Sequence, residues 1–485
     1  FDPDTSSRIK LLYIEHISNP QKLLKHATSL RKKGCSIAAV KAGTSEAGSR
    51  AASSHTGAMA SPDVAVDALF QKAGIVRCYG REDLITIASV FTYPPLPGKN
   101  IGIITHAGGP AVMLTDALSE AGLSVPKISG PKSEELLTHL YPGSSVSNPI
   151  DFLATGNADQ LATIIDYSND HFDMIDAMVV IFGTPGLSRI YDVYDTLHEK
   201  MARSKKPVFP VLPSTLTAAD ETSAFLGKGH VNFPDEVNLG KALGRIINTP
   251  EPVSSPSEPP VVNVKLIREI IDKLEDGYIA PEYIQRLLDA AGIPRAKEVV
   301  VNQELDLLNQ LKDIGFPLVM KVIGPLHKSD VGGVVLDIRS EDQALSEFAR
   351  MMKIQGASGV LLQPMLKGIE LFAGAKYEPG FGHLFLFGMG GIYIEVYKDI
   401  LTVLSPVAPA DIERKLHELK GYKILSGIRG HHGINIGMFA EIVGRLSALV
   451  EAAPEIAELD LNPLLGSAEM VIAVDARIRI QKVRL

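Results

Sequence analysis

Short apolar runs in the N-terminal part of the chain alternate with longer stretches in which apolar residues recur at helical spacing. The pattern predicts strand 9–14, helix 21–32, strand 36–40, helix 63–73, strand 75–78 and helix 82–91. Strands and helices that alternate at this spacing are typical of a parallel sheet with helices on its faces. No element precedes the first strand, so we expect an upstream segment or a partner chain to complete this sheet.

A second series of the same kind begins after the proline-rich break at 94–97. It predicts strand 101–105, a turn at 106–110, helix 111–121 and further strands at 177–182 and 207–212. This is again the pattern of a doubly wound parallel sheet.

The pattern changes in the second half of the chain. Residues 249–262 are rich in Pro and Ser and have no periodicity, which predicts an extended linker. Helices at 264–273 and 280–291 follow, and beyond them the pattern is that of an α+β domain. We therefore expect an α/β protein with a domain at 1–97, a second at 98–248, the linker at 249–262 and a third domain at 263–485.

One long segment, from Lys41 to Pro62, consists almost entirely of Gly, Ala, Ser and Thr around a single histidine, His55. It has neither a helical nor an alternating apolar pattern, so it is predicted to be a loop. Loops of this length inside compact domains are usually functional or disordered. Small residues let the backbone approach a phosphate, and an imidazole can accept a phosphoryl group as a nucleophile. The alternative is a flexible surface loop whose histidine is incidental.

Composition limits the partners and the location. The net charge of −8 comes from mixed signs without a basic stripe, so we expect neither nucleic acid nor an anionic membrane as a partner. No segment approaches the roughly 18 apolar residues of a membrane span. Only two cysteines are present, which excludes a disulfide framework and fits a reducing cytosol. We expect a cytoplasmic protein of several domains.

Residues suited to a nucleotide follow one another in the third domain. Lys321 ends a strand and suits phosphates, and His327 lies on a glycine-containing loop directly after it. Gln363 and Met365 precede Glu370, as in a hinge segment beneath an adenine. Each residue alone has an ordinary interpretation, since a lysine at a strand end is most often a solvated charge. Their order along the chain is more specific than any one of them.

Two further groups suit ions. Asp460, Asn462 and Asp475 place carboxylate and amide oxygens on neighbouring strands, and oxygen ligands of this kind suit Mg²⁺ once phosphate oxygens complete the shell. Gly108 and Gly109 open a helix, whose free backbone N–H groups suit a phosphate.

At this point the chain resembles the ADP-forming (NDP-forming) acyl-CoA synthetase family, which is related to succinyl-CoA synthetase and ATP-citrate lyase. The matching runs are Leu11–Glu15, Lys41–Gly43, Ser54–Ala58, Asn148–Asp151, His327–Gly333, Phe387–Gly391, Gly427–Gly430 and Asp460–Pro463. The resemblance implies two flavodoxin-like doubly wound parallel-sheet domains followed by an α+β ATP-grasp domain. It also implies an acid–CoA ligase, in which a phosphohistidine on a swinging loop exchanges its phosphoryl group with an acyl phosphate before CoA takes the acyl group.

The resemblance assigns roles to named residues. His55 would be the phosphohistidine, and Glu15 would orient its imidazole at the acyl-phosphate site. His327 would be an auxiliary histidine near the nucleotide, and Asp460 would stabilise the phosphohistidine when it visits the ATP site. A carboxylate that accepts the proton of one ring nitrogen fixes the tautomer, so a histidine that works at two sites needs such an anchor at each.

The remaining roles concern ATP, Mg²⁺ and CoA, the cofactors and co-substrate of the family. Asn462 and Asp475 would bind Mg²⁺, Lys321 would contact ATP phosphates, and Arg429 would bind phosphate within the ATP site. The family's first, CoA-binding domain has no counterpart in this sequence. We therefore expect an upstream CoA-binding domain or a separate subunit to supply it, with assembly as a homodimer or heterotetramer. The carboxylic acid substrate is left open.

Two other functions fit parts of this pattern. One is a catalytically silent, acyl-CoA-sensing module of a protein lysine acetyltransferase, which the presence of His55, Glu15 and His327 disfavours. The other is a lyase that first activates its substrate as an acyl-CoA, which uses the same phosphoryl relay.

Overall fold

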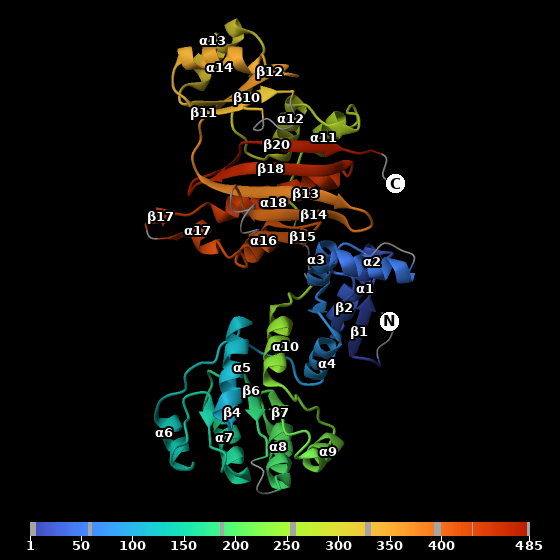
Figure 1. The fold of residues 1–485 in the computed structure, drawn as a ribbon, viewed down its shortest axis with the longest axis vertical. Coiled ribbons are helices and arrows are strands. Elements are labelled where there is room, and N and C mark those ends of the chain that lie inside the picture. Colours follow the sequence, from blue (N-terminus) through green and yellow to red (C-terminus); the bar gives the residue numbers. More distant parts are fainter. Residues whose placement is uncertain are drawn as a thin grey trace. The chain divides into compact units, whose positions relative to one another are not determined.

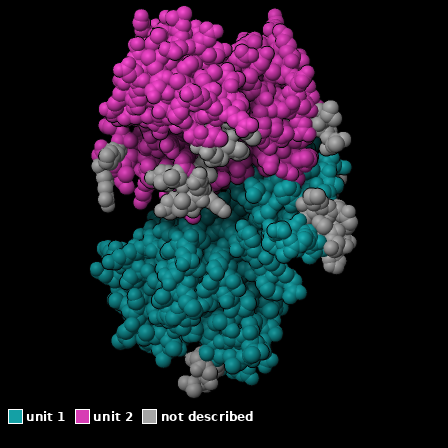
Figure 2. Space-filling model, turned by 45° about the horizontal axis from the view of Figure 1, so that its top comes forward, with its two compact units in different colours: residues 1–254 teal, residues 255–485 magenta. Residues whose placement is uncertain are grey.

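The computed structural model describes residues 6–56, 61–184, 189–252, 259–324, 331–391, 399–428 and 430–482, with the side chains of 52–56 and 431 left out. The chain divides into two compact units, Phe1–Ser254 and Ser255–Leu485 (Figure 2). The division falls within the Pro/Ser-rich segment. No helix of the described parts is long and apolar enough to cross a bilayer.

The first sheet of unit 1 is parallel, in the order β1-β2-β3 (Figure 1). Its elements are β1 (Ile9–Ile14), α1 (Pro20–Lys32), β2 (Ser36–Lys41), α2 (Glu46–Thr56), α3 (Asp63–Ala73), β3 (Val76–Cys78) and α4 (Arg81–Val90). Ile14 pairs with Lys41, so β1 and β2 end at the same level. Side chains that follow these two strands therefore share one edge of the sheet.

The predicted loop at 41–62 is wrong in one respect, because it contains the helix α2. Its residues from Glu46 to Ala51 are exposed or half-buried, and Arg50 pairs with Glu46 one turn earlier. A helix segment that buries no side chain, as at 46–51, needs no apolar stripe, so periodicity does not reveal it. Alanine is nevertheless the strongest helix former, and an i,i+4 ion pair adds a little stability.

The second sheet of unit 1 is also parallel, in the order β5-β4-β6-β7. Its strands are β4 (Ile101–Thr105), β5 (Ile150–Asp151), β6 (Ala177–Ile181) and β7 (Val208–Val211). The helices are α5 (Gly108–Glu120), α6 (Pro131–Thr138), α7 (Ala158–Asp170), α8 (Tyr191–Arg203), α9 (Ala219–Gly227) and α10 (Glu236–Asn248). Every residue of β4, β6 and β7 is buried, which explains why these strands are visible in the sequence as unbroken apolar runs.

One hydrophobic cluster connects the two sheets of unit 1: Ile87 and Val90 of α4 share it with Ile101 of β4 and Leu239 of α10. The strand order of the second sheet places its topological switch point between β4 and β6, where ligands bind in open α/β sheets.

Unit 2 contains a small antiparallel sheet in the order β11-β10-β12-β9. Its elements are β9 (Val299–Val301), α13 (Glu304–Ile314), β10 (Leu318–Ile323), β11 (Val334–Ile338), α14 (Glu341–Met351) and β12 (Gly359–Pro364). Leu307 of α13 and Met351 of α14 belong to its core.

The larger sheet of unit 2 has the order β15-β14-β13-β18-β20-β8, with β19 paired to β18. Its strands are β8 (Gly277–Tyr278), β13 (Ile369–Glu378), β14 (Gly382–Met389), β15 (Ile400–Leu404), β18 (Ile456–Gly466), β19 (Val471–Ala473) and β20 (Ala476–Ile480). Its helices are α11 (Val264–Ile271), α12 (Pro281–Ala291), α16 (Pro409–Leu416), α17 (Tyr422–Ser426) and α18 (Ile436–Ala452), and β16 (Gly427–Ile428) pairs with β17 (His431–His432). The predicted fold class is confirmed: two parallel α/β sheets are followed by an α+β unit (Figure 1).

Candidate functional site

Two polar side chains of the small sheet in unit 2 meet one carbonyl of the larger sheet. Lys321 Nζ and the Gln363 side-chain amide Nε2 both donate to the Val474 carbonyl oxygen, at 3.0 and 2.9 Å. Val474 lies between β19 and β20, so these two hydrogen bonds connect the sheets of unit 2. Both side chains are buried, with 7% and 1% of their surface exposed.

The other polar atom of the Gln363 side chain is its amide oxygen, Oε1. This Oε1 atom is buried, and no donor among the described residues reaches it. A buried acceptor without a donor is costly, about 1–3 kcal/mol, and rare in folded proteins. The exocyclic amine of an adenine is a donor of the required kind, so this atom fits the predicted nucleotide site.

Glu298, which no sequence pattern singles out, adds a carboxylate to this group. Its Oε2 lies 3.5 Å from Gln363 Nε2, and it lines a cavity with Arg295, Leu361 and Asp475. Burial raises the pKa of Glu298, while hydrogen bonding and the neighbouring Lys321 oppose that shift. A lone glutamate ahead of a short strand carries no sequence signal of this position.

Of the predicted metal ligands, Asn462 lies on β18 and Asp475 lies in the connection between β19 and β20. The Asn462 N–H donates to the Asp475 carbonyl oxygen at 3.1 Å, and the Ala476 N–H donates to Asp475 Oδ1 at 3.1 Å. No three His, Cys, Asp or Glu side chains converge as a metal centre in the described ranges. Mg²⁺ is commonly bound by one or two carboxylates together with phosphate oxygens and water, and Asn462 with Asp475 suit that role.

Asp460 faces a different hollow from Asp475. It lines a pocket of about 230 Å³ with Arg477, Glu458 and Lys376. Burial raises the pKa of Asp460, and the positive charge of Arg477 opposes this shift. Asp460 lies on the same strand as Asn462, and its carboxylate shares a pocket with Arg477. A carboxylate in this position can accept a hydrogen bond from a proton-donating group.

The two other hinge residues are placed by their backbone. The Met365 N–H donates to the Pro317 carbonyl oxygen at 3.0 Å. Glu370, in β13, is exposed, and its carbonyl accepts from the Gly390 N–H at 2.8 Å. A Cβ at Gly391 would collide with the Glu370 carboxylate, so this glycine leaves space for that side chain.

Three predicted residues lie wholly or partly outside what the structure describes. His327 and Arg429 fall outside the described residues, and of His55 only the backbone, near the end of α2, is described.

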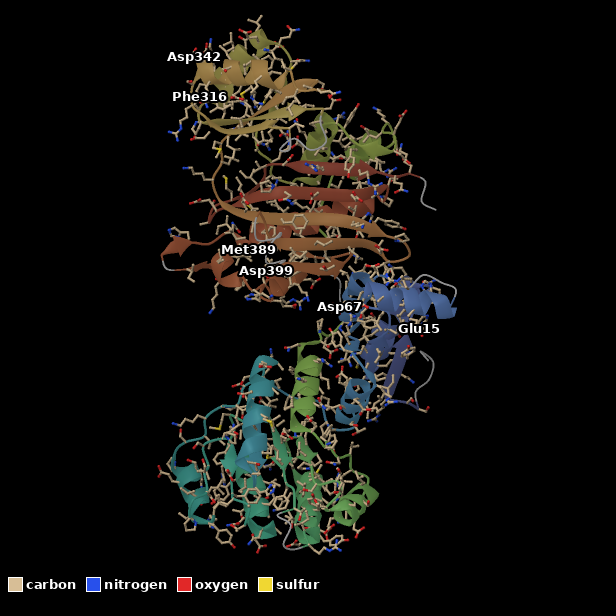
Figure 3. The ribbon with its side chains drawn as sticks, in the orientation of Figure 1. Glu15, Asp67, Phe316, Asp342, Met389 and Asp399 are labelled. Atoms are coloured by element: carbon tan, nitrogen blue, oxygen red, sulfur yellow. The ribbon has the colours of Figure 1, made fainter. Side chains whose placement is uncertain are left out.

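In unit 1, Glu15 directly follows β1 (Figure 3). It is half-buried, and its Oε1 accepts from the Tyr13 hydroxyl at 3.1 Å, which raises the pKa of Tyr13. Ser61 connects this edge to the chain that follows α2: its Oγ accepts from the Ile17 N–H at 3.0 Å and lies 3.4 Å from His16 Nδ1. Glu15 therefore precedes two residues, His16 and Ile17, that lie beside Ser61.

At the second sheet, α5 begins at Gly108 rather than at the predicted residue 111. No side chain caps this helix start, and Gly108 and Gly109 belong to its first turn. The Asp151 carboxylate lies beside Gly108, close to where a Cβ would be. His106 is buried against Phe182 with Nδ1 3.3 Å from the Ile181 carbonyl oxygen, and burial lowers its pKa.

Two family models match the chain. Residues 273–480 match an ATP-grasp domain, and residues 1–91 match a succinyl-CoA ligase like flavodoxin domain.

Alignments to curated proteins cover most of the sequence. The ADP-forming 4-hydroxybutyrate–CoA ligase of Nitrosopumilus maritimus is 31% identical over 483 residues, which are 95% of this chain and 68% of that protein. The beta subunit of ADP-forming acetate–CoA ligase I of Pyrococcus furiosus is 35% identical over 225 residues, 44% of this chain and 96% of its own. A structure of acetyl-coenzyme A synthetase 1 of Ca. Korarchaeum cryptofilum, with coenzyme A bound, covers 45% of this chain and 99% of its own at 30% identity and a TM-score of 0.42.

Proposed function

The chain belongs to the family of ADP-forming acid–CoA ligases, and we propose that His55 carries the phosphoryl group by which it makes acyl-CoA, ADP and phosphate from an acid, CoA and ATP. The observation that supports the nucleotide half of this proposal most strongly is the buried, unpaired Gln363 Oε1 beside Lys321. The alternatives of a silent acyl-CoA sensor and of a lyase are not favoured by the relatives.

ATP would bind in unit 2. Gln363 would accept the adenine amine and Met365 would line the base. Glu370 would bind the sugar and Lys321 the phosphates. Arg429 would add a positive charge to the phosphates.

Asn462 and Asp475 would hold Mg²⁺, which neutralises phosphate charge when it is bound. The protein's own part is to present two oxygen ligands from residues whose backbones are hydrogen-bonded to each other, Asn462 in β18 and Asp475 just before β20. His327 would lie near the nucleotide as an auxiliary histidine.

The phosphoryl relay has three balanced steps. A neutral imidazole nitrogen of His55 attacks the γ-phosphorus of ATP and ADP leaves. A carboxylate oxygen of the acid then attacks the same phosphorus, which frees the imidazole and gives an acyl phosphate. The CoA thiolate attacks the acyl carbon, and inorganic phosphate leaves. Asp460 at the nucleotide and Glu15 at the acid would each accept a hydrogen bond from the N–H of the second ring nitrogen.

The rest of the assembly belongs to this proposal as well. The domains would run over 1–97, 98–248 and 263–485, joined by the linker 249–262. Gly108 and Gly109 would present the N-terminus of α5 to a phosphate. An upstream domain or a separate subunit would bind CoA, within a homodimer or heterotetramer. The protein would be cytoplasmic, which suits Cys35 and Cys78, both buried and unpaired.

Exchange of label between ADP and ATP tests the relay without the acid. With Mg-ATP and labelled ADP, the enzyme moves label into ATP, because His55 takes up and returns the γ-phosphoryl group. His55→Gln keeps a hydrogen-bonding side chain without the nucleophile, so exchange falls to background while ATP still binds. Exchange at the unaltered rate in this variant contradicts the proposal.

A further inference from the structure

Lys41 ends the central strand of the first sheet and is buried, with 4% of its surface exposed. Its Nζ donates to the Gly43 carbonyl oxygen at 2.8 Å. Among the described residues, no carboxylate lies within ion-pair distance of this ammonium group. Burial lowers the pKa of Lys41, and the field of Asp63 opposes that shift.

A buried ammonium without a carboxylate is uncommon. Lysine is almost never fully buried unless it is paired, because an unpaired charge loses its hydration without compensation. Lysine also has three N–H donors, and Gly43 accepts one of them. Lys41 therefore has the charge and the donors to bind an anion that the described part of the chain does not supply.

The nearby carboxylates are already engaged. On α3, Asp63 and Asp67 bind the two terminal nitrogens of Arg77, at 2.5 and 3.0 Å. At the end of β1, Glu15 accepts from the Tyr13 hydroxyl. None of these three carboxylates forms an ion pair with Lys41 in the described part of the chain, so its charge can be met by an anion from outside this group.

The position of Lys41 agrees with a ligand role. Its partner in the sheet is Ile14, so it is level with the end of β1, and ligands bind beyond the carboxyl ends of parallel strands. From Lys41 the chain turns through Gly43, at φ +72°, into α2, which bears His55. The chain after α2 returns to the same edge, where Ser61 accepts from the Ile17 N–H.

We propose that Lys41 is the positive charge that receives the phosphoryl group of phospho-His55 at the carboxyl end of the β1-β2 sheet. This inference rests on the proposed function and adds a residue to its acid-side station. Lys41 would contact the phosphoryl oxygens when the group is transferred to or from the acyl phosphate.

The ionisation of the phosphoryl group tests this contact. The intact chain is phosphorylated with Mg-ATP, freed of nucleotide and titrated by ³¹P NMR, since the second ionisation of a phosphoryl group falls near pH 6. In Lys41→Met the titration midpoint rises by about one pH unit, because a nearby positive charge favours the dianion. Lys10→Met is the matched control. Lys10 is also buried, with 6% of its surface exposed, but it lies near the amino-terminal end of β1, at the other end of the strands from Lys41.

Each result decides one question. A raised midpoint in Lys41→Met, with Lys10→Met at the unaltered value, supports the contact. An unchanged midpoint in Lys41→Met overturns it, and so does an equal shift in both variants. Lys41→Gln replaces the methionine variant if that one melts early; a folded lysine variant that takes up no phosphoryl group also overturns the proposal, because Lys41 would then act with ATP. If the unaltered chain takes up no phosphoryl group on His55, the proposed function itself fails.

Discussion

Gln363 donates both to Val474 and toward Glu298, and it keeps its carbonyl oxygen unpaired among the described residues. Gln363 was predicted from its place in a hinge-like segment. Lys321 was predicted as the last residue of a strand, whereas β10 continues to Ile323. Lys41 and Glu298 could not be found in this way, because their signal is burial without sufficient partners. Burial of a charged side chain depends on elements distant in sequence, such as α3 around Lys41.

Gln363→Leu tests the adenine contact. Leucine keeps the volume and removes the acceptor, so the adenine amine loses one hydrogen bond, worth about 0.5–1.5 kcal/mol, and ATP binds roughly two- to thirteenfold more weakly. Displacement of a fluorescent nucleotide measures this change in Kd. An unaltered Kd for ATP would place the adenine elsewhere.

Glu298 gives a pH dependence with a defined sign. Its pKa is raised in the folded state, so between its ordinary value of 4.5 and that raised value the folded chain binds more protons than the unfolded chain. Stability therefore falls as pH rises through this window. Glu298→Gln removes this loss. The difference in Tm, variant minus unaltered chain, is therefore larger at pH 7 than at pH 4. Parallel Tm profiles for the two proteins contradict this assignment.

Among the secondary-structure elements, the buried strands were predicted from the sequence, whereas a helix with exposed side chains was missed. β4, β6 and β7 are buried throughout and are apolar apart from Thr105 at the end of β4, so their runs were visible. The exposed α2 has no stripe and was missed. The start of α5 was misplaced because Gly-Gly-Pro is typical of a turn, although Pro110 is tolerated in a first turn where its missing N–H has no partner anyway. The Asn148 motif proved structural: its side chain bonds Ile103, Ile101 and Pro126.

The exposure of α2 predicts little contribution to global stability. Ala51→Gly on this exposed helix changes the global free energy of unfolding by less than about 0.5 kcal/mol, since the helix opens locally at low cost. Ala68→Gly in α3, where the side chain is buried, costs about 1.5–2 kcal/mol through helix propensity and a lost methyl group. Urea unfolding of both variants measures the difference. Equal losses would mean that α2 packs as firmly as α3.

At the scale of the whole molecule, the two units have separate hydrophobic cores: the core of Ile181 and Leu239 lies in unit 1, and that of Leu371 and Phe439 in unit 2. The division between them falls within the Pro/Ser-rich segment. The contact between the small and large sheets of unit 2 at Val474 could not be predicted from the sequence. The Val474 carbonyl accepts from side chains that are more than a hundred residues away along the chain.

Separate cores predict separate thermal responses. Mg-ATP at a hundredfold excess over its Kd stabilises the unit that binds it by about 2.7 kcal/mol. In calorimetry, the transition of unit 2 therefore moves upward while that of unit 1 stays. Asp475→Ala reduces the shift, because the metal-binding carboxylate is lost. An upward shift of the unit 1 transition alone would mean that the nucleotide binds to unit 1, and would contradict the assignment of the site to unit 2.

The most direct measurement of the central claim is the intact mass of the protein after incubation with Mg-ATP, for the unaltered chain beside His55→Gln. We expect an acid-labile gain of one phosphoryl group in the unaltered chain, mapped to His55, and none in the variant. The same gain in His55→Gln, or no gain in either protein while ATP is bound, would contradict the phosphohistidine relay.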